Sequence, residues 1–206
     1  MRLLELFAGT GPVGRAFRER GWEAVSLDRD MQAGIRTDVR QWDYTIYPQG
    51  HFDFIWASPP CTEYSAAKTR GIRKIEEANE IVQRVLRIID YFAPPFFVIE
   101  NPQTGLLKHQ PFMQHIPFAD VDYCRYGMPY RKRTRLWNNF NFAPRPLCRG
   151  DCRASVGGRH IHTAQQGGHL SYGGDRRFAR AQLYVVPREL VAEIAAAAGP
   201  AGVEDD

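Results

Sequence analysis

The stretch RLLELFAGTGPVGRAFRERG, residues 2–21, decides the expected fold of the chain. Its apolar beginning is typical of a buried strand, and a glycine-rich loop follows it. Pro12 suits the first turn of a helix and Gly21 suits its end, so a helix is predicted over residues 12–21. Glycines between a strand and a helix let the backbone approach a ligand, and a helix N-terminus favours a negative group. The loop alone does not identify the ligand, because NAD and FAD proteins and plain tight turns also use it.

Strand and helix patterns alternate beyond this stretch. Further strands are predicted over residues 23–28, 35–39, 52–58 and 94–101, and further helices over 75–92 and 187–198. This alternation favours an α/β fold with a mostly parallel sheet. Open sheets of this kind bind ligands beyond the carboxyl ends of their strands. Five such ends are therefore expected to face one crevice: Phe7–Gly11, Asp28, Asp38, Ser58–Cys61 and Glu100–Asn101.

The 206 residues suit one domain, alone or with a small appendage, and the hydrophobic content of 44% is ordinary for a globular protein. No apolar run reaches 18 residues, so no membrane span is expected. The N-terminus lacks the layout of a signal peptide, and we expect an intracellular, non-secreted protein whose cysteines are catalytic, metal-binding or buried. Nothing in the sequence indicates an oligomeric state.

The net charge of +4 hides an asymmetry along the chain. Residues 121–180 contain 12 Arg or Lys against 3 Asp or Glu, whereas the remaining residues contain 15 against 20. Aromatic residues, among them Tyr172 and Phe178, are interleaved with these arginines. A basic, aromatic-rich block favours a nucleic acid as partner. A solvated arginine-rich surface is the alternative reading.

Four motifs stand in one order: LFAGTGPVGRAF, SPPCTEYS, ENP and RKRTRLW. Together they resemble the DNA (cytosine-5) methyltransferases from residue 2 to about residue 140. The resemblance implies a Rossmann-like S-adenosylmethionine-dependent methyltransferase fold with a small, irregular, basic recognition insert, and DNA as the partner. It divides the chain into a catalytic domain (1–137), the insert with a candidate zinc site (138–182), and a C-terminal helix (183–206) that packs back on the catalytic domain.

The resemblance also implies which residues hold the cofactor. Asp28 would bind the ribose of S-adenosylmethionine, and Asp38 would reach its adenine amino group. The full set of implied cofactor residues is Phe7, Ala8, Gly9, Thr10, Gly11, Asp28, Asp38, Val39 and Pro59.

For catalysis, the resemblance implies Cys61 as nucleophile, Glu100 as the acid, and Arg133 and Arg135 as the cations at the base. C5 of cytosine is a poor nucleophile, and a thiolate that adds to C6 makes it reactive, so a covalent adduct on a flipped-out base is expected. A helix N-terminus and nearby arginines would lower the pKa of Cys61. The Gln that usually precedes the Arg-x-Arg pair is missing, since Tyr130 or Arg131 stands there.

Three alternatives stay open at this point. Enzymes that methylate an exocyclic amine carry a similar Pro-Pro turn, but an aromatic residue stands there at the position of Cys61. RNA could replace DNA as the substrate of the same C5 chemistry. A nucleic-acid binder that kept the fold without activity is the third. Residues 62–65 would close over the base or form an ordinary loop.

The segment CRGDCRASVGGRHIH, residues 148–162, carries two thiols and two imidazoles. Such a set can bind zinc in a tetrahedron, although the spacing is not that of a standard finger. Free cysteines with histidines that face phosphate are the alternative. The predicted ligands are Cys148, Cys152, His160 and His162, while Cys124 is expected to serve only as buried packing.

Overall fold

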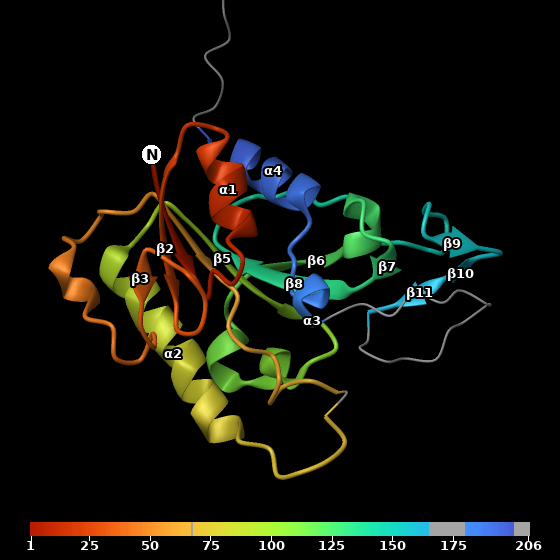
Figure 1. Cartoon of the computed structure of the whole chain (residues 1–206), viewed down its shortest axis with the longest axis horizontal. Helices are drawn as coiled ribbons and strands as arrows, with labels where there is room; N and C mark the ends of the chain where they lie inside the picture. The colour runs from red at the N-terminus through yellow and green to blue at the C-terminus, as the bar shows by residue number, and fades with distance from the viewer. Residues whose placement is uncertain (67, 165–179, 200–206) are drawn as a thin grey trace, which may run out of the picture.

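The computed structural model describes residues 1–66, 68–164 and 180–199, which fold around a seven-stranded sheet (Figure 1). Its strands are β1 (Arg2–Leu6), β2 (Glu23–Asp28), β3 (Ile35–Arg36), β4 (Phe54–Ala57), β5 (Phe96–Pro102), β6 (Phe118–Asp122) and β8 (Arg133–Asn138). They lie in the order β3-β2-β1-β4-β5-β8-β6. The first five are parallel, and β8 runs antiparallel to both β5 and β6. The predicted α/β fold with a mostly parallel sheet is confirmed.

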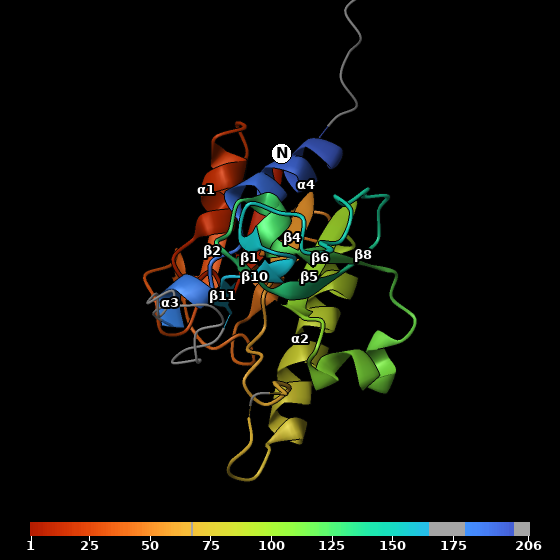
Figure 2. The same ribbon diagram turned by 90° about the vertical axis from the view of Figure 1, so that its right-hand side faces the viewer.

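Helices cover both faces of the sheet. Helices α1 (Pro12–Arg18) and α4 (Arg188–Ala197) lie on one face, and α2 (Ile75–Phe92) lies on the other, as the two views agree (Figures 1 and 2). Because side chains alternate along β1, Leu3 joins the core under α1 and α4, whereas Leu4 joins the core under α2. The shorter helices are η1 (Tyr44–Ile46), η2 (Leu106–His109), η3 (Pro111–Met113), η4 (Tyr123–Tyr126) and α3 (Arg180–Leu183).

Helix α2 spans the residues that its apolar spacing predicts. Glu76 and Glu77 in its first turn suit the positive end of the helix dipole, and Ala93 ends the helix with a left-handed φ of 44°. Other elements are shorter than predicted: α1 ends at Arg18 and β3 has two residues. None of the helices in the described ranges is long and apolar enough to cross a membrane.

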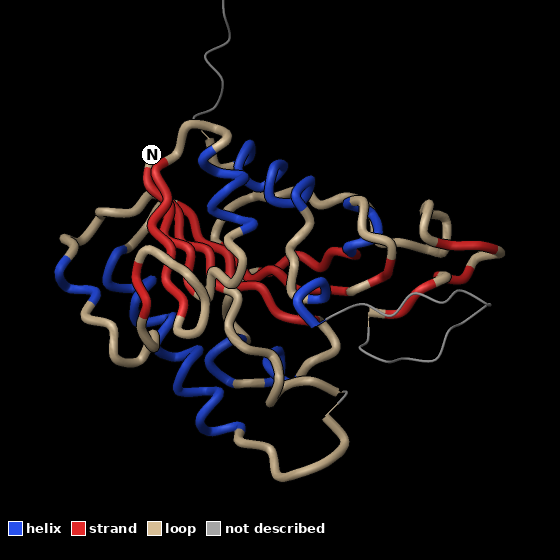
Figure 3. Tube along the Cα trace, in the orientation of Figure 1, coloured by secondary structure: helices blue, strands red, loops and turns tan. Residues whose placement is uncertain are grey.

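The insert, residues 138–182, departs from the layered sheet (Figure 3). Its described part contains a hairpin of β9 (Ser155–Val156) and β10 (Arg159–His160), and β11 (His162–Thr163), which pairs in parallel with β7 (Tyr130–Arg131). The sequence predicts an irregular insert, so these short strands are an addition. The predicted limit at residue 137 falls inside β8. Tyr172 and Phe178 of the basic block, and residues 200–206 of the C-terminal segment, lie outside the described residues.

Candidate active site

The loop after β1 turns sharply through three left-handed residues. Phe7, Gly9 and Gly11 have φ values of 60°, 54° and 68°, and at Phe7 this conformation costs about 1 kcal/mol or more. The Asp28 carboxylate accepts hydrogen bonds from Gly9 N at 2.9 Å on one oxygen and from Met31 N at 2.9 Å on the other. Asp28 therefore joins the loop after β1 to the loop after β2.

A cavity of about 620 Å³ opens between these two loops, a size typical of small-ligand sites. A Cβ atom placed on Gly9 or Gly11 would meet no atom within 4 Å, so the face of the loop is open. The cavity is lined by Glu5, Ala8, Gly9, Thr10, Gly11, Arg15, Arg18, Ser26, Met31, Gln32, Ala33 and Gly34. The glycine loop and Asp28, whose carboxylate accepts a hydrogen bond from it, fit a ligand such as S-adenosylmethionine. Nothing in the sequence indicated that residues 31–34 would form a wall of this cavity.

Some predicted cofactor residues lie elsewhere. The Asp38 carboxylate accepts two hydrogen bonds from the Arg40 side chain, at 2.7 and 3.0 Å, which hold the pKa of Asp38 at about 2. Val39 is buried in the core under α2. Pro59 is buried, and neither it nor Asp28, Asp38, Val39 or Phe7 is among the residues that line the cavity.

Glu5 is a buried carboxyl at the floor of this cavity. Its Oε2 accepts a hydrogen bond from Gly14 N at 3.0 Å, and a Cβ atom on Gly14 would lie 2.7 Å from that oxygen. Glycine at position 14 therefore leaves room for the Glu5 carboxylate beside the first turn of α1. Burial raises the pKa of Glu5 to about 7, against hydrogen bonds from Gly14 and Val13 and the charge of Arg18.

The SPPC turn follows the carboxyl end of β4 and is attached to β5. Asn101 Nδ2 donates a hydrogen bond of 2.9 Å to the Pro59 carbonyl, so the SPPC and ENP motifs meet at neighbouring strand ends. Cys61 is half-buried. Burial raises the pKa of its thiol, the charge of Glu100 raises it further, and Lys132 opposes both. The expectation of a lowered pKa is thus wrong for the free protein, because the nearest strong influences are burial and a carboxylate.

Two residues with no predicted role hold the buried side chain of Glu100. Tyr123 Oη donates a hydrogen bond of 3.0 Å to Glu100 Oε1, and Lys132 Nζ lies 3.6 Å from the same oxygen. The ammonium of Lys132 also lies 4.9 Å from the centre of the Tyr123 ring. Burial raises the pKa of Tyr123 well above its usual value, and the charge of Glu100 adds to this, so the phenol stays a donor. Cys61, Glu100 and Lys132 therefore form one electrostatic cluster.

The two predicted arginines bind carboxylates on β6 instead. Arg133 donates to both carboxylate oxygens of Asp122, at 2.8 and 3.1 Å, and Arg135 donates to both oxygens of Asp120, at 2.8 and 2.9 Å. The guanidinium of Arg135 also stacks on the Phe118 ring at 3.5 Å.

Strand alternation explains this placement. Glu100 stands opposite Leu136 in the β5–β8 ladder, whereas Arg135 stands opposite Asn101. Neighbouring positions on a strand point to opposite faces, so Arg135 and, two residues earlier, Arg133 point away from the face of Glu100. The structure does not bring either arginine to Glu100, which corrects the placement expected from the motif alone.

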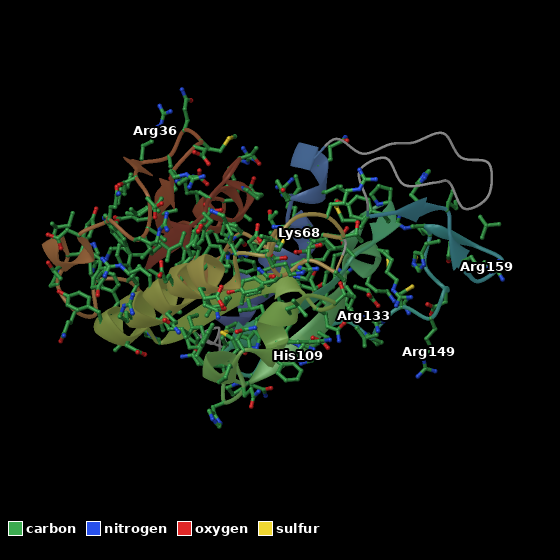
Figure 4. The ribbon with its side chains drawn as sticks, turned by 90° about the horizontal axis from the view of Figure 1, so that it is seen from below. Arg36, Lys68, His109, Arg133, Arg149 and Arg159 are labelled. Atoms are coloured by element: carbon green, nitrogen blue, oxygen red, sulfur yellow. The ribbon has the colours of Figure 1, made fainter. Side chains whose placement is uncertain are left out.

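The stretch after Cys61 is anchored rather than open. Tyr64 is fully buried, and its hydroxyl donates to Asn79 Oδ1 at 2.8 Å. Glu63 accepts from Lys68 Nζ at 2.5 Å, a residue marked in Figure 4, and Arg73 donates to the carbonyls of Glu63 and Ser65. Residues 62–65 are thus held against α2 and the residue 68–73 segment.

A second cluster combines three thiols and one imidazole. The ligand atoms of Cys124, Cys148, Cys152 and His160 all lie within 4.8 Å of one another. Cys124 thereby takes the place predicted for His162, which lies on β11 beside Tyr130 instead. The sequence suggested only packing for Cys124, because it lies 24 residues before Cys148 and the chain approaches it again through the fold of the insert.

The parallel sheet, the open glycine loop and the Cys61–Glu100 pair at neighbouring strand ends define a methyltransferase-like α/β enzyme. The model of the family described as C-5 cytosine-specific DNA methylase matches residues 1–116, and the chain belongs to this family.

One curated relative supports this membership, and solved structures share the fold. The chain is 35% identical to "Probable DNA (cytosine-5)-methyltransferase" of Frog virus 3 (isolate Goorha), over 94% of this chain and 98% of the relative. It is 26% identical to "Type II methyltransferase M.DdeI" of Desulfomicrobium norvegicum, over 71% of this chain but 42% of that protein. The fold resembles the Entamoeba histolytica methyltransferase EhMeth with a TM-score of 0.55, at 16% identity, over 71% of this chain and 56% of that one. A methyltransferase from an E. coli prophage gives a TM-score of 0.53, also at 16% identity, over 71% of this chain and 51% of that one.

Proposed function

We propose that this protein transfers a methyl group from S-adenosylmethionine to C5 of cytosine in DNA, through a covalent adduct of Cys61. The observation that supports this most is the meeting of Cys61 and Glu100 at the ends of β4 and β5, beside an open glycine loop. The chemistry needs one nucleophile and one acid on the same ring, and this arrangement offers both.

The cofactor would occupy the cavity between the loops after β1 and β2. Ala8–Gly11 would line it on one side and residues 31–34 on the other, while Asp28 keeps the two walls together. When bound, S-adenosylmethionine supplies an electrophilic methyl group on a sulfonium. Asp38 would have to exchange its Arg40 contact before it could meet an adenine amino group.

Cys61 begins the reaction as a thiol, because burial and Glu100 raise its pKa. Transfer of the thiol proton to the Glu100 carboxylate removes the charge that disfavours the thiolate. The sulfur then adds to C6 of cytosine, and Glu100, now protonated, donates to N3 as the ring takes up electrons. After methylation at C5, the N3 proton returns to Glu100 and the C5 proton passes to water, while the sulfur–C6 bond breaks and releases Cys61 as a thiolate.

We assign the cation at the base to Lys132. Its ammonium lies beside Glu100 and influences Cys61, whereas Arg133 and Arg135 are bound to carboxylates on β6. A positive charge there would stabilise the electron-rich ring of the adduct. Arg133 and Arg135 would act by holding β8 against β6, so they are positioning residues.

The insert would contact the DNA outside the catalytic pocket. Arg149, Arg153 and Arg159 are exposed on its described part, and Figure 4 shows Arg149 and Arg159 projecting from that end of the molecule. Exposed arginines suit phosphate contacts, which position a protein on a duplex. The base would have to leave the stack to reach Cys61. The division into a catalytic domain, an insert that binds zinc and a C-terminal helix remains part of this proposal.

A labelled-methyl assay tests the proposal directly. Wild-type protein incubated with labelled S-adenosylmethionine and duplex DNA should yield 5-methyldeoxycytidine on nucleoside analysis. Cys61→Ala should lower the rate by more than about a thousandfold, and Glu100→Gln by about a hundredfold or more. A duplex with 5-fluorocytosine should trap wild-type protein covalently, because fluorine blocks loss of the C5 substituent, while the matched cytosine duplex should not.

Other outcomes would redirect or end the proposal. N4-methyldeoxycytidine as product would point to amine chemistry without an adduct. Label in tRNA but not in DNA would make RNA the substrate. An absence of both label and adduct on every substrate would leave a nucleic-acid binder without activity.

A further inference from the structure

The cluster of Cys124, Cys148, Cys152 and His160 has the dimensions of a zinc tetrahedron. Zinc lies about 2.3 Å from sulfur and about 2.0 Å from nitrogen, so sulfur–nitrogen edges of about 3.5 Å are expected. His160 Nε2 lies 3.4 Å from Cys148 Sγ and 3.3 Å from Cys152 Sγ. All four cysteines of the chain are free thiols. Three thiols are an odd number, so they cannot all form disulfides with one another. Together with one imidazole they form a common set of structural zinc ligands.

The chain around the ligands is shaped to bring them together. Gly157 and Gly158 turn the β9–β10 hairpin with φ values of 57° and 79°, and this hairpin presents His160. Gly150, at a φ of 89°, lies so close to the hairpin that a Cβ atom would overlap the Gly158 carbonyl. Ser155 Oγ donates to the Cys152 carbonyl at 2.7 Å. The loop of Cys148–Cys152 is thus clamped onto the strand that carries the imidazole.

The described part of the insert has almost no core of its own. Among its described side chains from residue 143 to 164, Cys148 alone is buried, and Val156 is 66% exposed. So little burial cannot offset the loss of chain entropy, and small units of this kind usually depend on a metal or on disulfides. Metal binding would supply the missing stabilisation.

The ligands also connect the insert to the catalytic side of the molecule. Cys124 lies in η4, directly after Tyr123, the residue whose hydroxyl donates to Glu100. Cys148 N donates a hydrogen bond of 3.0 Å to the fully buried carboxylate of Asp122, which also binds Arg133. Arg125 donates to both oxygens of Asp151 within the ligand loop. The cluster is therefore a junction between the insert and β6–η4–β8.

We propose that Cys124, Cys148, Cys152 and His160 bind one structural zinc ion that fixes the DNA-facing insert onto the catalytic strands. Four protein ligands close the coordination sphere, so the ion has no place for a reacting water. The metal site stands on the cluster itself, whereas its effect on DNA binding rests on the proposed function. Zinc would hold the backbone that carries Arg149, Arg153 and Arg159.

Metal analysis of the full chain tests the ligand set. Wild-type protein should carry one zinc per chain, and replacement by cobalt should give the intense visible absorption of a tetrahedral thiolate site. His160→Ala should lose the metal, whereas His160→Cys should keep it, which separates lost ligation from failed folding. His162→Ala is the matched control, and it should keep the metal because His162 lies outside the cluster.

Several results would overturn the inference. One is wild-type protein that binds no stoichiometric zinc even when zinc is supplied. Another is loss of metal in His162→Ala together with retention in His160→Ala. Metal removal by a chelator should weaken DNA binding about tenfold or more, and unchanged DNA affinity would reject the role in holding the insert.

The two proposals fail separately. Cys61→Ala should keep the full zinc content while it loses methyl transfer. Wild-type protein that methylates DNA but binds no stoichiometric zinc, even when zinc is supplied, would end the zinc inference alone. Zinc-loaded wild-type protein that does not methylate would end the proposed function alone.

Discussion

The parallel and antiparallel parts of the sheet position their functional side chains in different ways. On the parallel side, β1, β2, β4 and β5 run in one direction, so the residues that follow them gather at one edge whatever the details of each loop. On the antiparallel side, function depends on which face of β8 a residue points to, and a shift of one residue reverses it. Lys132, directly before β8, lies 3.6 Å from Glu100, while Arg133, the first residue of β8, is bound to Asp122 on the other face. Motif order is therefore a better guide to the first part than to the second.

The largest expected effect concerns the buried carboxylate of the antiparallel side. Asp122→Ala should lower the free energy of unfolding by about 3–5 kcal/mol, because it leaves Arg133 and Cys148 N without their buried partner. Asp120→Ala removes the partner of Arg135, which is 20% exposed where Asp122 is fully buried, and should cost less, about 1–3 kcal/mol. Urea denaturation of both variants measures the difference. Equal losses would mean that Asp122 is not the central anchor of this side.

The next effect belongs to the parallel side and depends on pH. Burial raises the pKa of Glu5 from 4.5 to about 7, so the folded state binds a proton that the unfolded state releases. The contribution of Glu5 to stability is therefore full below about pH 4.5 and falls as the pH rises to about 7, by about 3 kcal/mol in all. Glu5→Gln should remove this fall from urea denaturation curves measured at several pH values. A Glu5→Gln profile that matches wild type would assign the pH dependence to another group.

The smallest of these effects in free energy concerns the cation proposed to lie at the cytosine base. Lys132→Met should lower kcat for methyl transfer about a hundredfold, equivalent to about 2.7 kcal/mol, because it removes the cation beside Glu100. Lys132→Arg should recover most of the activity. Arg131→Met, which removes a neighbouring exposed charge, serves as the control and should leave kcat within about threefold at saturating DNA.

Arg135→Met decides between the two placements of the cation. If Arg135→Met lowers kcat as much as Lys132→Met while the protein stays folded, then the arginine pair acts on the base. In that case β8 must turn its other face toward Glu100 when DNA binds. If its effect appears in stability rather than in kcat, Arg135 is a positioning residue.

Much of the fold and part of the site could be predicted from local patterns. The spacing of apolar residues predicted α2 over its full length, and the alternation of elements predicted the parallel sheet. The glycine loop and the SPPC turn could be recognised in the sequence because their conformation depends on the residues within them. The two short strand pairs of the insert were missed, since they follow from contacts rather than from any periodic pattern.

By itself, the sequence determined that the chain has a parallel α/β fold, a glycine loop after its first strand, and a cysteine and an acid at neighbouring strand ends. These features depend on short-range rules and on the common direction of the strands. Only the tertiary structure decided that Lys132 rather than Arg133 or Arg135 lies at Glu100, and that Cys124 rather than His162 joins the thiol cluster. The first depends on the register of β8 against β5, and the second on a loop that returns to a distant helix. Neither relation can be read from the spacing of residues along the chain.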